Sequence, residues 1–296
     1  MIPHVGVVGK QSIDYGQTMR LARFRTAPDA PAAVGLVEGD TVVRLDVPDD
    51  MVAVLEDLPS LPPRAEAHSL TDVHLLAPIA RPPKFLAIGL NYRDHCEETG
   101  MPAPEWPVFF NKQSTCVIGP TDDIVKPAVS DMVDYEGELG VVIGQRCRHV
   151  TAERAHEVIA GFLVVNDVTV RDWQLRSPTM TMGKSFDTHG PIGPWIVTAD
   201  ELGDPNELSI RTFVNDQQVQ DLRTSNMIFD IGTQVETLTT AFTLEPGDII
   251  STGTGAGVGI VRRPPLFLKV GDVCRVEIDG IGELVNHVVA DPATTR

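Results

Sequence analysis

Basic residues are scarce in this sequence, which has 24 lysines and arginines against 41 aspartates and glutamates. The formal net charge is −17. This surplus of negative charge argues against nucleic acid and anionic membranes as partners. A small anion remains compatible with it, because a bound metal ion and a few cations can reverse the electrostatic field inside one cleft.

Cysteine pairs and long apolar runs are also missing. The four cysteines (Cys96, Cys116, Cys147 and Cys274) are never spaced as C-x-x-C, so no zinc or redox site is indicated. No apolar run approaches the roughly 20 residues of a membrane-spanning helix. The first residues lack the basic and apolar segments of a secretory signal. We therefore expect a cytoplasmic protein.

The length of 296 residues allows one large domain, or one large and one small domain. Residues 1–18 are polar and mixed, and we expect them to be poorly ordered. Strands are predicted at 19–24, 33–37 and 41–45, followed by a short helix at 49–57. Residues 58–83 are rich in proline and favour a connection. We predict a small N-terminal domain with its linker at 1–78 and a catalytic domain at 79–296.

Beyond residue 150 the pattern predicts few helices and many strands. A helix is expected at 151–160, with Thr151 as its N-cap, and an amphipathic helix at 225–242. A hairpin is expected around the Asn215-Asp216 turn, and the tail alternates short strands with Gly-Asp turns. Without regular βαβ alternation, the expected class is α+β and β-rich.

The segment DYEGELGVVIG carries two carboxylates that we interpret as metal ligands. Glu136 and Glu138 stand two apart in a run of β-branched residues, which predicts a strand. Residues i and i+2 of a strand face the same side, so two like charges lie together beside apolar residues. A hard divalent cation between them would relieve that repulsion. The alternative is a solvated strand edge, which is where most acids lie.

Asp167 is the third acid of this set. It ends the apolar run that begins at Phe162, an unusual place for an acid in a core strand. Asp167, Arg171 and Gln174 are spaced i, i+4 and i+7, which predicts one helical face. We interpret the three side chains as one wall of a site, against the alternative that Asp167 is only a turn residue.

Two further segments carry candidate chemistry. His95 and Glu98 are three apart, so one helical turn would place them together, either as a functional pair or as surface residues. In the glycine-rich segment 252–259, uncovered N–H groups and the Thr254 hydroxyl suit a carboxylate or oxyanion, although a tight strand connection is equally compatible. The Walker A, dinucleotide-binding and zincin motifs each lack a required residue.

Six segments in order resemble the fumarylacetoacetate hydrolase (FAH) family: IGLNYRDHCEE, YEGELGVVIG, NDVTVRDWQ, GKSFDTHGPIGPW, TSNMIFDI and LEPGDIISTGTGAGVG. The resemblance extends over residues 84–289. It implies an FAH-type mixed β-sheet roll with a small N-terminal β-rich domain, usually as a homodimer. One departure is Gly255, at a position where the family commonly has proline.

The resemblance also implies the roles of the candidate residues. A divalent cation, Mg²⁺ or Mn²⁺ and in some members Ca²⁺, would be held by Glu136, Glu138 and Asp167. His95 and Glu98 would activate water, and Lys184 would steady an oxyanion. The substrate-binding set implied by the resemblance is Arg171, Gln174, Thr254 and Gly253.

The implied reaction is hydrolysis of a C–C bond in a 2,4-dioxo acid, an acylpyruvate or a fumarylpyruvate-like compound, through an enolate that the metal stabilises. An isomerase, tautomerase or decarboxylase acting on a related 2-oxo acid would use the same ligands. A hypothesis of another class is a metal-dependent ligand binder without turnover. We expect the substrate's distal group to contact residues 99–107, residues 175–182 and the N-terminal domain. Trp106, Phe109 and Met180 are candidates for this contact, or else core residues.

Overall fold

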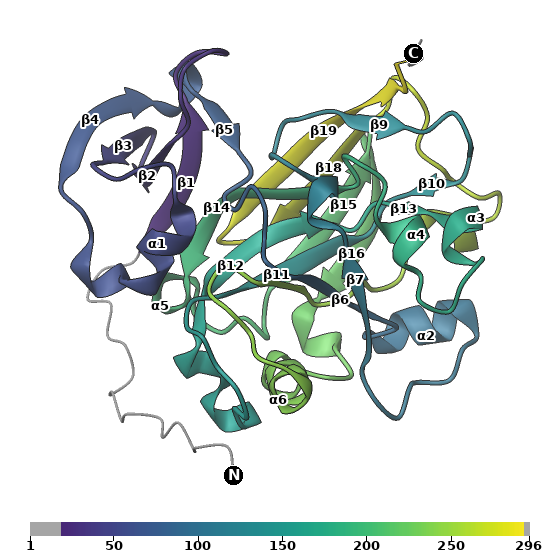
Figure 1. The fold of residues 1–296 in the computed structure, drawn as a ribbon. Coiled ribbons are helices and arrows are strands. Elements are labelled where there is room, and N and C mark those ends of the chain that lie inside the picture. The colour runs from purple at the N-terminus through teal and green to yellow at the C-terminus, as the bar shows by residue number, and fades with distance from the viewer. Residues whose placement is uncertain (1–18, 293–296) are drawn as a thin grey trace.

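The computed structural model describes residues 19–292, so the expected disorder of residues 1–18 lies outside the described residues. Three β-sheets form the framework of this part of the chain, and short helices lie around them (Figure 1). This confirms the predicted β-rich α+β class. No helix in the described range is long and apolar enough to cross a membrane.

The largest sheet has twelve strands, and its main path runs β4-β3-β2-β1-β14-β12-β11-β17-β6-β7, with β5 added to β1 and β8 to β14. Its strands are β1 (Arg20–Arg25), β2 (Ala33–Glu38), β3 (Thr41–Leu45), β4 (Arg64–Ser69), β5 (His74–Leu76), β6 (Phe85–Gly89), β7 (Val108–Lys112), β8 (Val117–Ile118), β11 (Gly137–Ile143), β12 (Ile159–Asn166), β14 (Gly190–Thr198) and β17 (Ile249–Ser251).

The N-terminal unit comprises β1–β5 and helix α1 (Met51–Glu56), and its elements β1–β3 and α1 form at the positions predicted from the sequence. The prediction that residues 58–83 are only a connection is wrong, because β4 and β5 lie within them and pair with β3 and β1. Asp50 caps α1, because its side chain accepts a hydrogen bond from the backbone of Ala53. Strand β1 pairs antiparallel with β14, with Leu21 opposite Ile196. The N-terminal unit therefore extends the sheet of the larger unit, and the predicted boundary after residue 78 falls in the loop between β5 and β6.

The predicted hairpin is confirmed as β15 and β16, which pair antiparallel in the five-stranded sheet. Asn215 takes a left-handed φ of 55° in its turn, a conformation that asparagine tolerates well. The five-stranded sheet, in the order β16-β15-β18-β19-β9, and the pair β10-β13 comprise β9 (Ile124–Lys126), β10 (Val133–Asp134), β13 (Thr169–Val170), β15 (Ser209–Val214), β16 (Gln217–Arg223), β18 (Val273–Ile278) and β19 (Gly282–Ala290).

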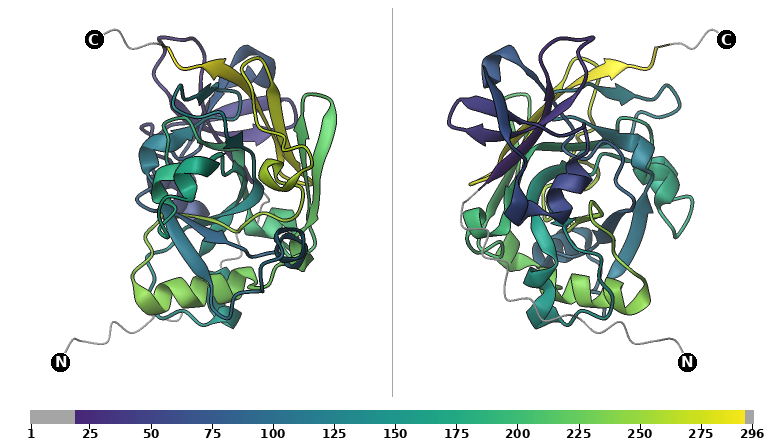
Figure 2. Two further views of the ribbon diagram at one scale, coloured as in Figure 1. Left: turned by 90° about the vertical axis from the view of Figure 1, so that its right-hand side faces the viewer. Right: turned by 60° about the vertical axis from the view of Figure 1, so that its left-hand side comes forward.

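Strand β12 explains why its sequence is apolar without alternation. Phe162 and Val164 pack into a cluster that also contains residues of the five-stranded sheet, which lies against the large sheet (Figure 2). Leu163 and Val165 pack on the opposite face, into a cluster with α1 and the N-terminal strands. Both faces of the strand are buried, so every position favours an apolar side chain.

The predicted helix at 151–160 is wrong over its last three residues. Residues Ala152–Glu157 form a 3-10 helix, and β12 begins at Ile159. The β-branched residues of this strand pair with β11 on one side and β14 on the other, and this tertiary pairing overrides the local helical signal. The amphipathic helix is confirmed as α6 (Ile231–Ala241), although it begins later than predicted.

The remaining α-helices are short. Three of them lie on the side of the molecule opposite the N-terminal unit, on the right in Figure 1: α2 (Arg93–Thr99), α3 (Arg171–Gln174) and α4 (Thr181–Lys184). The fourth is α5 (Ala199–Leu202). The three helices on the right carry most of the candidate residues other than the acids.

Candidate active site

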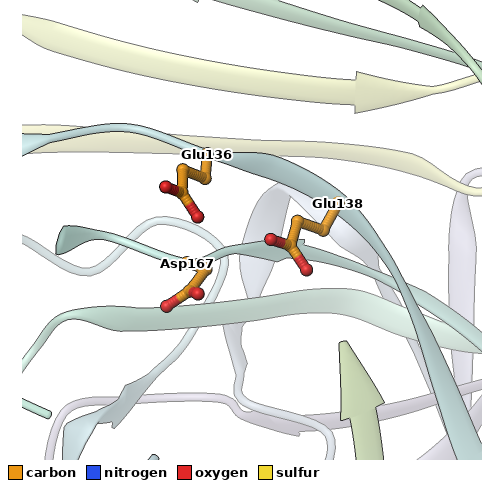
Figure 3. A group of neighbouring side chains, drawn as sticks. All are labelled: Glu136, Glu138 and Asp167. Atoms are coloured by element: carbon orange, nitrogen blue, oxygen red, sulfur yellow. The ribbon is translucent and has the colours of Figure 1, made fainter. Parts of the chain in front are cut away.

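Three carboxylates converge because of the register between β11 and β12 (Figure 3). Gly137 pairs with Asn166, so Glu136 lies opposite Asp167, whose N–H donates to the Glu136 carbonyl at 2.9 Å. Glu138, two residues further, shares the face of Glu136. All three side chains are buried, and they offer oxygen atoms within 4.8 Å of one another. The structure thus brings together the three acids that the sequence singled out.

Two cations contact this acidic cluster from α3 and α4. Lys184 donates from Nζ to Glu136 Oε2 at 2.6 Å and to Asp167 Oδ2 at 2.7 Å. Arg171 Nη1 lies 2.7 Å from Glu136 Oε1. Burial alone would raise the pKa of Glu136, but the charges of Lys184 and Arg171 outweigh it and lower the pKa to about 2. Glu136 is therefore a carboxylate at neutral pH.

Arg171 and Gln174 are neighbours as predicted, since Arg171 Nη1 donates to Gln174 Oε1 at 3.1 Å. The prediction that Asp167 shares a helical face with them is wrong. Helix α3 begins only at Arg171, because Thr169 and Val170 pair with β10 as the short strand β13. Asp167 is instead held at the end of a strand, which fixes it opposite Glu136.

Lys112 also belongs to the site, although no motif in the sequence analysis includes it. It ends β7, its side chain is fully buried, and its Nζ donates to Asp167 Oδ1 at 2.6 Å. The same ammonium donates to the backbone carbonyls of Lys184 and His189. Lys112 therefore fixes the orientation of the Asp167 carboxylate and ties it to the chain around Lys184.

Asp134 is a second residue that the sequence analysis did not select, although it begins the same DYEGE segment. Its carboxylate accepts from Arg171 Nε at 2.8 Å and from the backbone N–H groups of Gly259 and Ile260 at 2.7 and 2.9 Å. Arg171 is thus held between Asp134 and Glu136. This contact also ties the late glycine-rich segment to the strand that carries the acids.

Glu138 differs from its two partners because no lysine or arginine within residues 19–292 forms an ion pair with it. Its Oε2 accepts from Ser251 Oγ at 2.5 Å and from the N–H of Gly253 at 2.8 Å. Burial, together with the nearby charges of Asp167 and Glu136, raises the pKa of Glu138 to about 8. The carboxylate of Glu138 thus lacks a compensating positive charge.

A divalent cation fits this donor set. When Glu138 gives up its proton to ligate a cation, the four buried acids Glu136, Glu138, Asp167 and Asp134 carry four negative charges against the three positive charges of Lys112, Arg171 and Lys184, which leaves one negative charge in excess. The three converging acids offer only oxygen atoms as ligands, and Mg²⁺, Mn²⁺ and Ca²⁺ all bind oxygen ligands. Adding a double positive charge would turn the excess to one positive charge, which suits an anionic ligand.

His95 and Glu98 form a pair on α2, as their spacing predicted. His95 Nδ1 lies 2.8 Å from Glu98 Oε1, and Glu98 Oε2 accepts from the N–H of Gly257 at 2.9 Å. The carboxylate therefore fixes the imidazole, and the glycine-rich segment fixes the carboxylate. A histidine held in this way can act as a general base.

Thr254 is buried, and its hydroxyl is already engaged. It donates to the Gly137 carbonyl at 3.0 Å and accepts from Gln220 Nε2 at 2.9 Å. Gly255, the departure from the family pattern, packs so closely that a Cβ there would meet Leu222 Cδ2 at 2.6 Å. Gly253 has a φ of 92° and directs its N–H at Glu138, so it supports the acidic cluster.

A cavity of about 430 Å³ opens beside these groups. The predicted residues that line it are His95, Glu136, Arg171, Gln174, Lys184 and Thr254. Residues 99–107 and 175–182, where we expect the substrate's distal group to bind, contribute Met101 and Met180 to the lining. No described residue of the N-terminal domain lines this cavity, and the contact of each segment with the substrate stays a prediction.

The other two candidates for the distal pocket also lie outside the lining of this cavity. Trp106 is 73% exposed, and Phe109 packs against the core.

Residues 84–289 match the family model described as fumarylacetoacetate (FAA) hydrolase C-terminal, and residues 19–78 match one described as Rv2993c-like, N-terminal. The human mitochondrial oxaloacetate tautomerase FAHD2A is 40% identical over 288 residues, which cover 92% of each chain.

Two solved structures are similar along the same length. One is a 5-carboxymethyl-2-hydroxymuconate delta-isomerase from Mycobacterium smegmatis, with 40% identity and a TM-score of 0.78, covering 92% of this chain and 100% of that one. The other is a maleylpyruvate hydrolase from Sphingobium sp. SYK-6 in complex with manganese(II) and pyruvate. It has 32% identity and a TM-score of 0.77, and it covers 93% and 100% of the two chains. With this sequence match and the same fold, the chain belongs to the fumarylacetoacetate hydrolase family.

Proposed function

We propose that this chain is a divalent-metal-dependent enzyme that moves a proton at the carbon next to the keto group of a small 2-oxo acid, as a tautomerase or isomerase. The observation that carries this proposal is the His95–Glu98 pair, joined at 2.8 Å, on a cavity that Glu136 and Lys184 also line. The tautomerase and isomerase named among the similar proteins, each 40% identical, support this reaction class.

In the proposed reaction His95 exchanges a proton with C3 of the substrate. Glu98 accepts the hydrogen on Nδ1, which leaves Nε2 as the basic nitrogen. The C3–H bond breaks, its electron pair forms the C2–C3 double bond, and the keto oxygen takes up a proton. A rigid Glu98, itself held by Gly257, keeps the imidazole in this orientation.

The two cations that line the cavity, Arg171 and Lys184, would hold the anionic substrate. Arg171 and Lys184 each contact Glu136, and Gln174 is placed to bind a neighbouring oxygen through its amide. Glu136, Glu138 and Asp167 would hold Mg²⁺, Mn²⁺ or Ca²⁺, and the ion would supply Lewis-acid stabilisation of the negative charge that develops on the substrate oxygens.

Hydrolysis of a C–C bond is the second candidate, and the same histidine pair favours it. His95 would take a proton from water, the water oxygen would bond to C4 of a 2,4-dioxo acid, and the C3–C4 bond would break. Pyruvate and a carboxylic acid would be the products, with a proton added at C3. The maleylpyruvate hydrolase among the similar structures supports this alternative.

One experiment separates the two reactions. Oxaloacetate and acetylpyruvate are incubated in ²H₂O with metal-stripped protein, with and without Mg²⁺ or Mn²⁺. Deuterium uptake at C3 is followed by NMR, and pyruvate is measured with lactate dehydrogenase against a protein-free control. We expect metal-dependent keto–enol exchange without extra pyruvate.

Stoichiometric, metal-dependent release of pyruvate and acetate from acetylpyruvate would instead establish hydrolysis, whereas release of pyruvate and CO₂ from oxaloacetate would establish decarboxylation. Metal and 2-oxo acid binding without either reaction would establish a non-catalytic binder. The His95→Gln variant should lose the reaction, whereas His156→Gln, at an exposed position on the 3-10 helix of residues 152–157, is the matched control.

Two further expectations belong to this proposal. A homodimer should have about twice the chain mass of 32.1 kDa in light scattering. A cytoplasmic location and the absence of nucleic-acid and membrane partners stay predictions from the sequence.

A further inference from the structure

Exposed apolar side chains are concentrated beside the cavity. Eight large hydrophobic residues are exposed in the described part of the chain, and five of them lie in the segments 99–108 and 175–182. These five are Met101, Trp106, Val108, Leu175 and Met182. Met101, Val108 and Leu175 also line the cavity. Apolar surface gathered at a cavity in this way indicates a binding site.

The cations of the cavity lie at one end only. Among the described residues that line the cavity, Arg171 and Lys184 are the only basic ones apart from His95, and both contact Glu136, at 2.7 and 2.6 Å. The rest of the lining is mainly apolar, including Met101, Val108 and Leu175. The wall away from Glu136 therefore offers no lysine or arginine to a second carboxylate.

The polar side chains elsewhere in the lining are already engaged. The Thr99 hydroxyl donates to the backbone carbonyls of His95 and Cys96, at 2.8 and 3.2 Å. The Ser177 hydroxyl is hydrogen-bonded to Thr179 Oγ1 at 2.9 Å. His95 is held by Glu98. A buried carboxylate placed at this end would lose its hydration without gaining a charged partner.

We propose that the substrate carries an uncharged apolar group, a short alkyl or aryl chain, at the end opposite its 2-oxo-carboxylate. This inference rests on the proposed function, because it assumes that the 2-oxo-carboxylate lies at the Glu136 end. The distal group covers Met101, Val108 and Leu175, which are 51%, 42% and 74% exposed without it. Each methylene that the cavity buries should strengthen binding about three- to fourfold.

The test measures binding, so that it stands apart from turnover. Calorimetry on Mn²⁺-loaded protein compares 2-oxobutanoate, 2-oxohexanoate and 2-oxooctanoate with 2-oxoglutarate, which has a carboxylate at its far end. We expect affinity to rise with chain length, and 2-oxoglutarate to bind at least about tenfold more weakly than 2-oxohexanoate. Equal or tighter binding of 2-oxoglutarate would overturn the proposal.

A charge-reversal variant sharpens the test. Val108 begins an edge strand and is exposed, so Val108→Arg is compatible with the fold and adds a cation to the lining. It should raise the affinity for 2-oxoglutarate relative to 2-oxohexanoate by about tenfold or more. Val129→Arg, at another exposed valine outside the cavity lining, is the matched control and should leave the ratio unchanged.

Leu175→Ser separates a ligand site from a subunit interface. We expect it to weaken 2-oxohexanoate binding severalfold while the mass in light scattering stays that of the unsubstituted protein. A change of mass with unchanged affinity would show that the apolar surface belongs to a contact between copies, which would overturn the proposal. A preference for alkyl chains without proton transfer would support the proposed substrate class and reject the proposed function.

Discussion

Ion pairs occur in two parts of the large sheet, but their surroundings differ. In the N-terminal unit, Arg44 and Glu66 meet at 2.8 Å with 40% and 55% of their side chains exposed. In the candidate active site, Lys112 and Asp167 meet at 2.6 Å with both side chains fully buried. Exposed pairs contribute only about 0–1 kcal/mol, whereas a buried pair costs a large desolvation energy that only excellent geometry offsets.

The difference shows that the desolvation cost of buried charges falls on the candidate active site and not on the N-terminal unit. The N-terminal unit keeps its charges at the surface and fills its interior with apolar side chains. The candidate active site buries acids and cations in a connected network. Buried charges that are not needed for packing are expected at functional sites, where ionisation and geometry must be controlled. The predictions below test this contrast, from the largest expected effect to the smallest.

Glu138→Gln should have the largest effect on turnover and little effect on stability. The variant removes one proposed metal ligand, so we expect turnover to fall roughly 10³-fold or more, since metal ions stabilise transition-state charge by several kcal/mol. Gln can still accept from Ser251 and Gly253, and no ion pair is broken. Unfolding of the metal-free protein in urea should show equal or higher stability.

Glu136→Gln is the contrasting variant, because it leaves Arg171 and Lys184 with a missing partner. It should lose both turnover and stability. Full turnover in Glu138→Gln would show that the third acid is not needed, and the proposed metal centre would be wrong.

Glu98→Gln tests whether the histidine pair acts in catalysis or only stabilises α2. Without the carboxylate, Nδ1 of His95 loses its acceptor charge, and we expect turnover to fall roughly 10²- to 10⁴-fold, the range for general acid–base catalysis. The pH profile of kcat should shift, and Mn²⁺ affinity should stay unchanged. A profile of unchanged shape with a lower melting temperature would indicate a structural role instead.

Lys112→Met compares the two kinds of ion pair directly. Removing this lysine leaves the Asp167 carboxylate with Lys184 alone, and breaking a buried pair destabilises by about 3–5 kcal/mol. The matched variant Arg44→Met, which breaks an exposed pair, should lose about 0–1 kcal/mol. Urea unfolding of both variants measures the difference. Similar losses in the two would remove the contrast between the regions.

The acids could be predicted from the sequence because their signal is local. Glu136 directly precedes β11 and Glu138 lies within it, and their two-residue spacing predicts that they share one face. The pairing of Gly137 with Asn166, which puts Asp167 opposite Glu136, joins residues far apart in the chain. The sequence therefore indicated the three acids of the cluster, whereas the register that brings them together required the structure.

Lys112 and Asp134 could not be selected because their roles depend on distant partners. A lysine at the end of an apolar strand usually extends into solvent, and only packing against α4 and the chain near His189 buries this one. Asp134 reaches backbone groups at Gly259 and Ile260, more than 120 positions away. The helix predicted at 151–160 ends early for the same reason. Its last residues belong to β12, which begins at Ile159 and pairs with β11.

His189 extends the comparison to pH. It is fully buried, its Nε2 lies 3.0 Å from the Val125 carbonyl, and its Nδ1 has no partner among the described residues. Burial is the main cause that lowers its pKa from 6.5 to about 4, and the charge of Lys112 adds to it. Between pH 6.5 and pH 4, His189 therefore binds a proton in the unfolded chain but not in the folded chain. The free energy of unfolding should fall as the pH falls through this range.

At about 1.4 kcal/mol per pH unit, this histidine should account for about 2 kcal/mol of the stability lost between pH 6.5 and pH 5. Urea unfolding at pH 7.5 and pH 5 should show a smaller loss in His189→Gln than in the unsubstituted protein, by that amount. An equal loss in both proteins would place the acid sensitivity elsewhere. A smaller loss in the variant would show that the buried imidazole of His189, beside the charged network of the candidate active site, contributes to the loss of stability in acid.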